Sequence, residues 1–144
     1  MDGKDRNQHK ECTSSKQGKG KIVFVIEVRE HFDAAHALRG YKGKCENLHG
    51  HRFEVVVTLK ATELDEIGLA FDFSVLKRHL REILASFDHT YLNDVPPFDG
   101  INPSSENIAA TIYKEFQKRE LLIFSVQVCE SADSCVTYIP DNPG

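Results

Sequence analysis

The residues best suited to chemistry lie in the stretch from Cys45 to His51, which runs directly into alternating apolar residues over 53–57. Side chains alternate between the two faces of a strand, so His49 and His51 point to the same side if this segment is extended. Two imidazoles placed in this way can share one metal ion. The stretch therefore predicts a metal site at the start of a strand, with a thiol close by.

A third imidazole belongs to the same predicted site. An apolar phase of even-numbered residues runs along 21–38 and reaches His36, which places His36 on the inner face of a first strand. Three histidines with an open fourth position form a catalytic zinc arrangement, in which the metal polarises a substrate oxygen or lowers the pKa of a bound hydroxyl. We therefore expect His36, His49 and His51 to bind one metal ion.

Cys45 allows three interpretations. It could be a fourth metal ligand, which would close the site and make it structural, or a free thiol whose pKa is lowered from about 8.5 by the metal and by Lys44. It could also be a small buried hydrophobic residue. The segment from Gly43 to Asn47 is too polar for a core, so the third interpretation is not favoured.

Two carboxylates stand at positions that need an explanation. Asp88 lies beside His89 just after a predicted helix, where a carboxylate can orient a histidine for proton transfer. A histidine at a helix C-terminus also offsets the helix dipole, and the residues alone favour that role. Glu130 ends an apolar strand phase, so it could hold a guanidine-like edge through two hydrogen bonds, or form a salt bridge at the strand end.

The elements that must position these residues follow from hydrophobic periodicity. Helical spacing predicts one helix capped by Asp72 or Ser74 and a second helix that starts near Ser104. In the third of the four predicted strands, Leu122 falls in the same phase as Glu130. Alternation predicts strands over residues 21–38, 49–60, 121–130 and 134–139.

This order of elements favours an α+β fold in which two helices cover one face of an antiparallel four-stranded sheet. Such a sheet leaves two edges exposed, and exposed edges are usually paired or covered. We therefore expect subunits to associate.

Composition narrows the functional class. The chain has 144 residues and a net charge of −4 with no basic stripe, which argues against nucleic-acid binding. It has no run of about 18 apolar residues to span a membrane and no secretory signal, so we expect a cytoplasmic protein. Residues 1–20 predict a disordered tail, and 21–140 a single domain. The four cysteines are expected to be reduced thiols.

Together these residues resemble the 6-pyruvoyl-tetrahydropterin synthase superfamily over about residues 22–139. Three residues separate Cys45 from His49, which resembles the carboxytetrahydropterin synthase branch of queuosine biosynthesis; the pyruvoyl branch has a longer insertion, and a third branch has Glu in place of the Cys. The matching segments, in order, are Phe32-Asp-Ala-Ala-His36-Ala-Leu, Cys45-x3-His49-Gly-His51, Gly68-x3-Asp72-Phe73, Asp88-His89-x-x-Leu92-Asn93, Asn102-Pro-Ser-Ser-Glu106-Asn107 and Glu130. Departures are Ser104-Ser105, where the family often has Thr, and Cys129, where Lys is common.

The resemblance implies a T-fold whose subunits form trimeric barrels that stack into a homohexamer, a dimer of trimers. It implies a zinc-dependent lyase that converts 7,8-dihydroneopterin triphosphate into 6-carboxy-5,6,7,8-tetrahydropterin, with a 6-pyruvoyl product as the alternative. A closed structural zinc site without catalysis is the alternative of another class. The implied roles are zinc binding by His36, His49 and His51, proton acceptance by Cys45, a relay by Asp88 and His89, a pterin anchor at Glu130, and substrate contacts at Ser104, Ser105 and Glu106. Arg39, Lys42 and Lys44 are candidates for binding the triphosphate.

Overall fold

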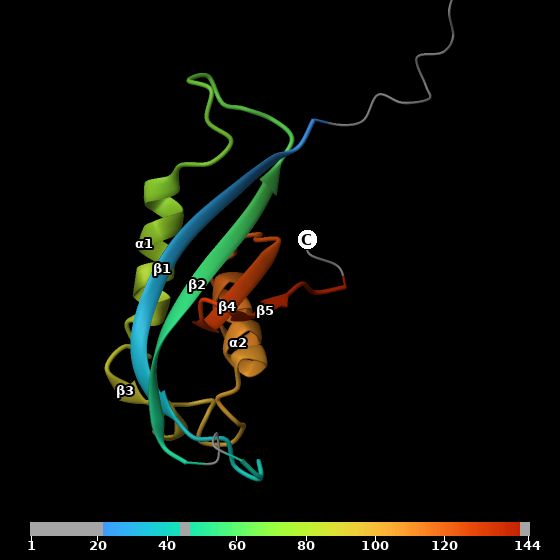
Figure 1. Cartoon of the computed structure of the whole chain (residues 1–144). Helices are drawn as coiled ribbons and strands as arrows, with labels where there is room; N and C mark the ends of the chain where they lie inside the picture. The colour runs from blue at the N-terminus through green and yellow to red at the C-terminus, as the bar shows by residue number, and fades with distance from the viewer. Residues whose placement is uncertain (1–21, 44–46, 142–144) are drawn as a thin grey trace, which may run out of the picture.

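Two antiparallel strands of 13 residues each, β1 (Phe24–His36) and β2 (His49–Ala61), form the centre of the fold (Figure 1). They pair along their whole length, so the end of β1 meets the start of β2. The computed structural model describes residues 22–43 and 47–141. The predicted tail, Cys12 and Cys45 lie outside the described residues.

The remaining strands extend this ribbon on both sides. β4 (Ser125–Ser131) pairs with β2, and β5 (Ser134–Tyr138) pairs with β4, both antiparallel. These four strands are the expected antiparallel sheet. A two-residue strand that the sequence did not predict, β3 (Thr90–Tyr91), pairs parallel with β1, and the complete order is β3-β1-β2-β4-β5.

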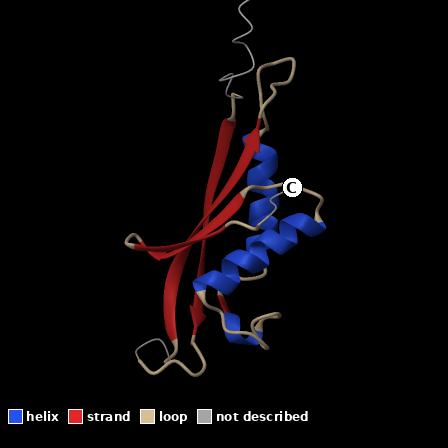
Figure 2. Ribbon diagram, turned by 90° about the vertical axis from the view of Figure 1, so that its right-hand side faces the viewer, coloured by secondary structure: helices blue, strands red, loops and turns tan. Residues whose placement is uncertain are grey.

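Both helices lie on one face of the sheet, as expected (Figure 2). Helix α1 (Phe73–Leu84) begins at the predicted cap Asp72, whose side chain accepts a hydrogen bond from the backbone N–H of Ser74. Helix α2 (Ser105–Lys118) begins at Ser104, whose hydroxyl accepts from the N–H of Asn107. A short 3-10 turn, η3 (Leu92–Asp94), follows β3. Each hydroxyl or carboxylate cap stabilises its helix by about 1 kcal/mol.

The core lies between the helices and the inner face of the sheet. The even phase of β1 and the odd phase of β2 are buried there, and the rings of Phe32 and Phe53 stack with centroids 4.9 Å apart. Burial of one such side chain contributes about 1.5–3 kcal/mol. The two phases continue past this core to His36 on β1 and to His51 and His49 on β2, so the same periodicity that builds the core positions the histidines.

The third predicted strand starts later than the sequence indicated. The structure begins β4 at Ser125, and Leu122 is 71% exposed, whereas its neighbour Ile123 is buried. The chain leaves α2 through Glu120, which has a positive φ of 59°. Residues 121–124 therefore turn toward the sheet before the regular alternation starts, and the predicted inward position of Leu122 is wrong.

One expectation about the cysteines is also wrong. Cys129 on β4 and Cys135 on β5 form a disulfide. They occupy directly opposite positions in the β4–β5 ladder, and this register brings together two residues that the sequence treated as independent thiols. Within the described ranges, every helix is too short or too polar to span a bilayer.

Candidate active site

The three predicted metal ligands converge at one end of the β1–β2 ribbon. His36 pairs with His49, and Ala34 pairs with His51, so the three imidazoles share one face of the sheet. Ring centroids are 4.4 Å apart for His36 and His49, 4.7 Å for His49 and His51, and 5.3 Å for His36 and His51. One ring nitrogen from each lies within 4.8 Å of the other two. The three rings could therefore bind one ion.

Backbone carbonyls orient two of these rings. His36 Nδ1 donates a hydrogen bond to the carbonyl oxygen of Pro103, and His49 Nδ1 donates to that of Asn47, both at 2.7 Å. A carbonyl can only accept, so Nδ1 carries the proton and Nε2 carries a lone pair. Both Nε2 atoms are buried without a hydrogen-bond partner among the described residues. Buried nitrogens without a partner are rare, and a metal ion would satisfy both.

The environment of His36 also favours metal binding. Its side chain is fully buried, and this burial lowers the pKa of His36 below 6.5 despite the hydrogen bond to Pro103. The imidazole is therefore neutral at neutral pH, which is the form that binds metals. Zinc prefers such nitrogen ligands, and its catalytic sites commonly have three protein ligands. The donor set fits zinc.

Glu130 lies beside the histidines. Its Oε1 is 3.8 Å from His36 Nε2, too far for a hydrogen bond, and it accepts a hydrogen bond of 3.1 Å from the hydroxyl of Ser105. Pairing between β2 and β4 ends at Cys129, and the β4–β5 ladder is irregular between Cys129 and Ser131. Such a bulge redirects side chains. Within the described chain Glu130 pairs with no Lys or Arg, so the structure does not support a surface salt bridge.

Asp88 and His89 form an ordered acid–base pair. Asp88 Oδ2 lies 2.9 Å from His89 Nδ1, and Asp88 Oδ1 accepts a hydrogen bond of 2.9 Å from the N–H of Asp33. These hydrogen bonds, the one from Asp33 first, lower the pKa of Asp88, which keeps it ionised. His89 lies five residues beyond the end of α1 at Leu84 and bonds Asp88 instead, so it does not cap that helix.

A second metal site at this pair is not supported. Asp33, Asp88 and His89 also place one ligand atom each within 4.8 Å of the others. However, Asp33 Oδ1 accepts from the Nε of Arg52 at 3.2 Å, and both oxygens of Asp88 accept the hydrogen bonds described above. The carboxylates are therefore already paired.

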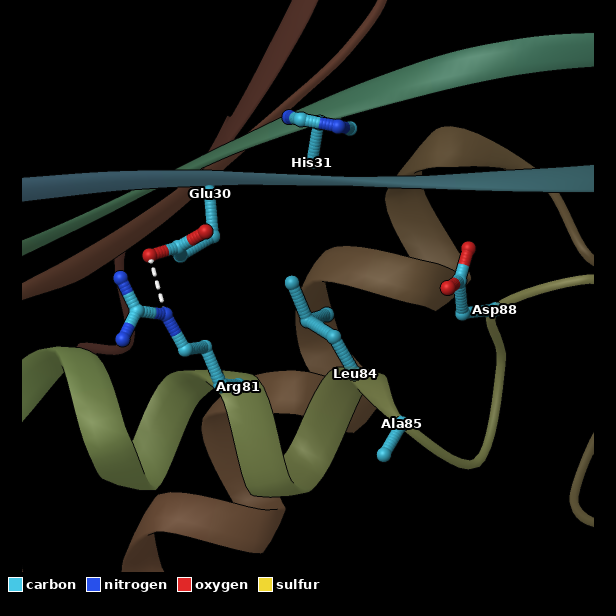
Figure 3. Close-up of a pocket in the computed structure, with 6 residues that line it drawn as sticks. All are labelled: Glu30, His31, Arg81, Leu84, Ala85 and Asp88. Atoms are coloured by element: carbon cyan, nitrogen blue, oxygen red, sulfur yellow. Dashed lines mark hydrogen bonds and ion pairs between the residues drawn. The ribbon is translucent and has the colours of Figure 1, made fainter.

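Asp88 also borders a small cavity between β1 and the end of α1 (Figure 3). The cavity has a volume of about 220 Å³. Glu30 and Arg81 bridge it with an ion pair of 2.8 Å, drawn as a dashed line in the figure. The metal-site histidines do not line it. Its lining residues are Glu30, His31, Arg81, Leu84, Ala85 and Asp88.

Comparison with known proteins accounts for this arrangement. The family model described as 6-pyruvoyl tetrahydropterin synthase matches residues 25–141. The chain belongs to this family. It is 38% identical over 139 residues to 6-carboxy-5,6,7,8-tetrahydropterin synthase of Bacillus subtilis, covering 89% of this chain and 93% of the relative. It is 37% identical over 122 residues to the enzyme of the same name from Synechocystis sp., covering 81% and 93%.

The fold of this pterin synthase family is seen in a solved relative. The structure of Caenorhabditis elegans 6-pyruvoyl tetrahydropterin synthase matches with a TM-score of 0.74 and 27% identity, covering 83% of this chain and 97% of that one. The expected T-fold is thereby confirmed. The oligomeric barrel remains a prediction.

Within this pterin synthase fold, the structure joins some predicted site residues and leaves others apart. Ser105 contacts Glu130, whereas the hydroxyl of Ser104 serves as the helix cap and Glu106 is exposed in the first turn of α2. Among the described residues, neither of these two is hydrogen-bonded to Glu130. Cys45 lies outside the described residues, so its predicted position beside the metal stays a prediction.

Sequence reasoning missed the groups that hold the ligands in place. These are the carbonyls of Pro103 and Asn47 and the backbone of Asp33. Backbone groups leave no signature in residue types. One signal was present: Asn93 is a polar residue that is only 6% exposed, and a buried carboxamide must have partners.

Proposed function

We propose that this protein is a zinc-dependent 6-carboxy-5,6,7,8-tetrahydropterin synthase of queuosine biosynthesis. It would convert 7,8-dihydroneopterin triphosphate into 6-carboxy-5,6,7,8-tetrahydropterin, releasing triphosphate and acetaldehyde. The names of its relatives at 37–38% identity support this function, as does the three-residue spacing between Cys45 and His49. The observation that carries the proposal is the convergence of His36, His49 and His51 with two buried nitrogens that have no hydrogen-bond partner among the described residues.

Substrate binding is assigned to Glu130 and the start of α2. A carboxylate accepts two hydrogen bonds in one plane from the amine and ring N–H of an amino-pyrimidine edge. The hydroxyl of Ser105 holds Oε1 and so fixes the plane of the carboxylate. Ser104 and Glu106 complete the assigned contacts at the same end of the helix.

Proton transfer is assigned to Cys45, Asp88 and His89. A zinc ion held by His36, His49 and His51 would polarise the side-chain hydroxyls of the substrate and make the adjacent C–H acidic. Cys45 removes that proton as a thiolate. His89 returns a proton elsewhere on the side chain, and ionised Asp88 fixes its tautomer and stabilises the imidazolium. The resulting tautomerisation permits triphosphate loss and side-chain cleavage.

The catalytic domain is assigned to residues 21–140, and its assembly to a homohexamer built as a dimer of trimers. Strands β3 and β5 are the two edges of the described sheet. Strand edges carry unpaired backbone groups and tend to pair with another chain or to be covered. Association through these edges would close the sheet.

Incubation with 7,8-dihydroneopterin triphosphate and Zn²⁺, followed by mass analysis, tests the proposal. We expect 6-carboxy-5,6,7,8-tetrahydropterin together with acetaldehyde. A product that keeps the side chain as 6-pyruvoyl-tetrahydropterin, without acetaldehyde, would assign the alternative activity. Absence of turnover, combined with loss of zinc on Cys45→Ala, would instead identify a closed structural zinc site.

A further inference from the structure

The free edge of β1 is paired by side chains where strand pairing stops. Strand β3 pairs with β1 only at Ala34 and Ala35. Two residues further on, the N–H of Ala37 donates to Asn93 Oδ1 at 2.9 Å, and Asn93 Nδ2 donates to the carbonyl of Ala37 at 2.8 Å. The carboxamide of Asn93 therefore acts as one more rung of the ladder.

Asn102 repeats this contact at the next rung. The N–H of Arg39 donates to Asn102 Oδ1 at 3.0 Å, and Asn102 Nδ2 donates to the carbonyl of Arg39 at 2.9 Å. Backbone groups of residues two apart point to the same edge of an extended chain. Ala37 and Arg39 thus present one continuous edge, and each of the two carboxamides satisfies both the N–H and the C=O of one residue.

The side chain of Arg39 secures the same connection from the other direction. Its Nη2 donates to the carbonyls of Asn93 at 3.2 Å and Phe98 at 2.9 Å, and its Nη1 donates to that of Ile101 at 3.3 Å. Segments 37–39, 93–98 and 101–102 are therefore cross-linked by seven hydrogen bonds. Arg39, a sequence candidate for binding the triphosphate, is engaged with backbone carbonyls in this structure.

Both carboxamides act next to His36. Asn93 holds Ala37, which directly follows His36, and Asn102 directly precedes Pro103, whose carbonyl accepts the hydrogen bond from His36 Nδ1. One contact therefore fixes the backbone at the ligand, and the other fixes the acceptor that sets the direction of its ring. Groups that orient a metal-binding histidine typically change metal affinity about 10–100-fold when they are removed.

We propose that Asn93 and Asn102 are positioning residues of the metal site. Neither reaches the ion; together they hold the backbone of His36 and the carbonyl of Pro103 so that Nε2 of His36 faces the other two histidines. The inference rests on the metal site of the proposed function. It predicts that metal affinity depends on two carboxamides of the loops that follow β3.

The test measures zinc affinity by competition with a chromophoric chelator, and the visible spectrum of the Co²⁺-substituted full-length protein. Asn93→Leu and Asn102→Leu keep the side-chain size but cannot hydrogen-bond. We expect each to weaken zinc binding about 10–100-fold and to change the Co²⁺ absorption bands, because the direction of the His36 ring alters the ligand field. Asn102→Asp keeps the acceptor for the N–H of Arg39 and loses the donor, so its effect should be smaller.

Ile112→Val is the matched control, since Ile112 is fully buried in the core on α2 and its variant lowers the melting temperature without touching the ladder. Wild-type affinity and an unchanged Co²⁺ spectrum in Asn102→Leu would overturn the inference, as would an equal loss in Ile112→Val. If Asn93→Leu fails to fold, Asn102→Leu decides. A wild-type protein that binds no zinc would refute the proposed metal site itself, whereas a wild-type protein that binds zinc as tightly as both Leu variants would refute only the positioning role.

Discussion

His36 and His49 face each other across the last pair of the β1–β2 ladder, and both direct a buried Nε2 into the same space. Each ring is held by a carbonyl at 2.7 Å on the opposite nitrogen. Two imidazoles with fixed tautomers and no partner for their lone pairs, among the described residues, are set up to share a cation. This relationship is the physical basis of the predictions about metal and substrate.

His49→Ala should remove most of the bound zinc, because it deletes one of three ligands and leaves two. Metal analysis of the purified protein measures this, with about one zinc per chain expected in the wild type. His31→Ala is the control, since His31 is an exposed histidine on β1 outside the cluster. Full zinc content in His49→Ala would contradict the assignment, and Cys45→Ala should keep the metal.

Glu130→Gln should weaken pterin binding by about 1.5–3 kcal/mol, the scale of a hydrogen bond to a charged group. Gln keeps the shape but places a donor against the donors of the pterin edge. Binding of a pterin ligand can be followed by calorimetry, and zinc content should stay at the wild-type level. Normal pterin binding combined with easier unfolding would show that Glu130 only stabilises the strand end.

Asp88→Asn should lower kcat by about 10²–10⁴-fold, the usual contribution of a positioned acid–base group. The amide can still accept from the N–H of Asp33 but then turns its NH₂ toward His89 Nδ1. The pKa of wild-type Asp88 is lowered from 3.8, so its contribution to stability is present above 3.8 and is lost as pH falls through the lower folded-state value. Acid unfolding should reveal this loss in the wild type and not in Asp88→Asn; unchanged kcat in the variant would exclude a relay role.

Thiol titration of the denatured protein should find two free thiols before reduction and four after it. The chain has four cysteines, and two of them, Cys129 and Cys135, form the disulfide between β4 and β5. Alkylation followed by peptide mass analysis identifies which cysteines react. Four reactive thiols without reductant would show that these strands pair without the covalent link.

The protein should be larger than a dimer in solution, because the described sheet has two open edges at β3 and β5. Light scattering measures the mass, and a homohexamer is expected. If sites lie between subunits, mixing Cys45→Ala with His89→Ala should restore some activity, since mixed assemblies contain intact sites. A stable, active monomer would refute both expectations.

Period-two alternation in the sequence was enough to place His36, His49 and His51 on one face. A side chain's face depends only on its position along its own strand, so this part of the site is a local property. The helix caps at Asp72 and Ser104 were predicted for the same reason, since each acts on a backbone N–H two or three residues away.

Tertiary structure decided what depends on distant neighbours. Asn93 contacts a residue 56 positions away and Asn102 one 63 positions away, and no periodicity reports a pairing across such a separation. The bulge that directs Glu130 toward His36, and the register that joins Cys129 to Cys135, depend on how β4 meets β5. Residue types show which groups can bind a metal or a pterin, but the hydrogen bonds that orient them come largely from backbone atoms, which are the same in every residue.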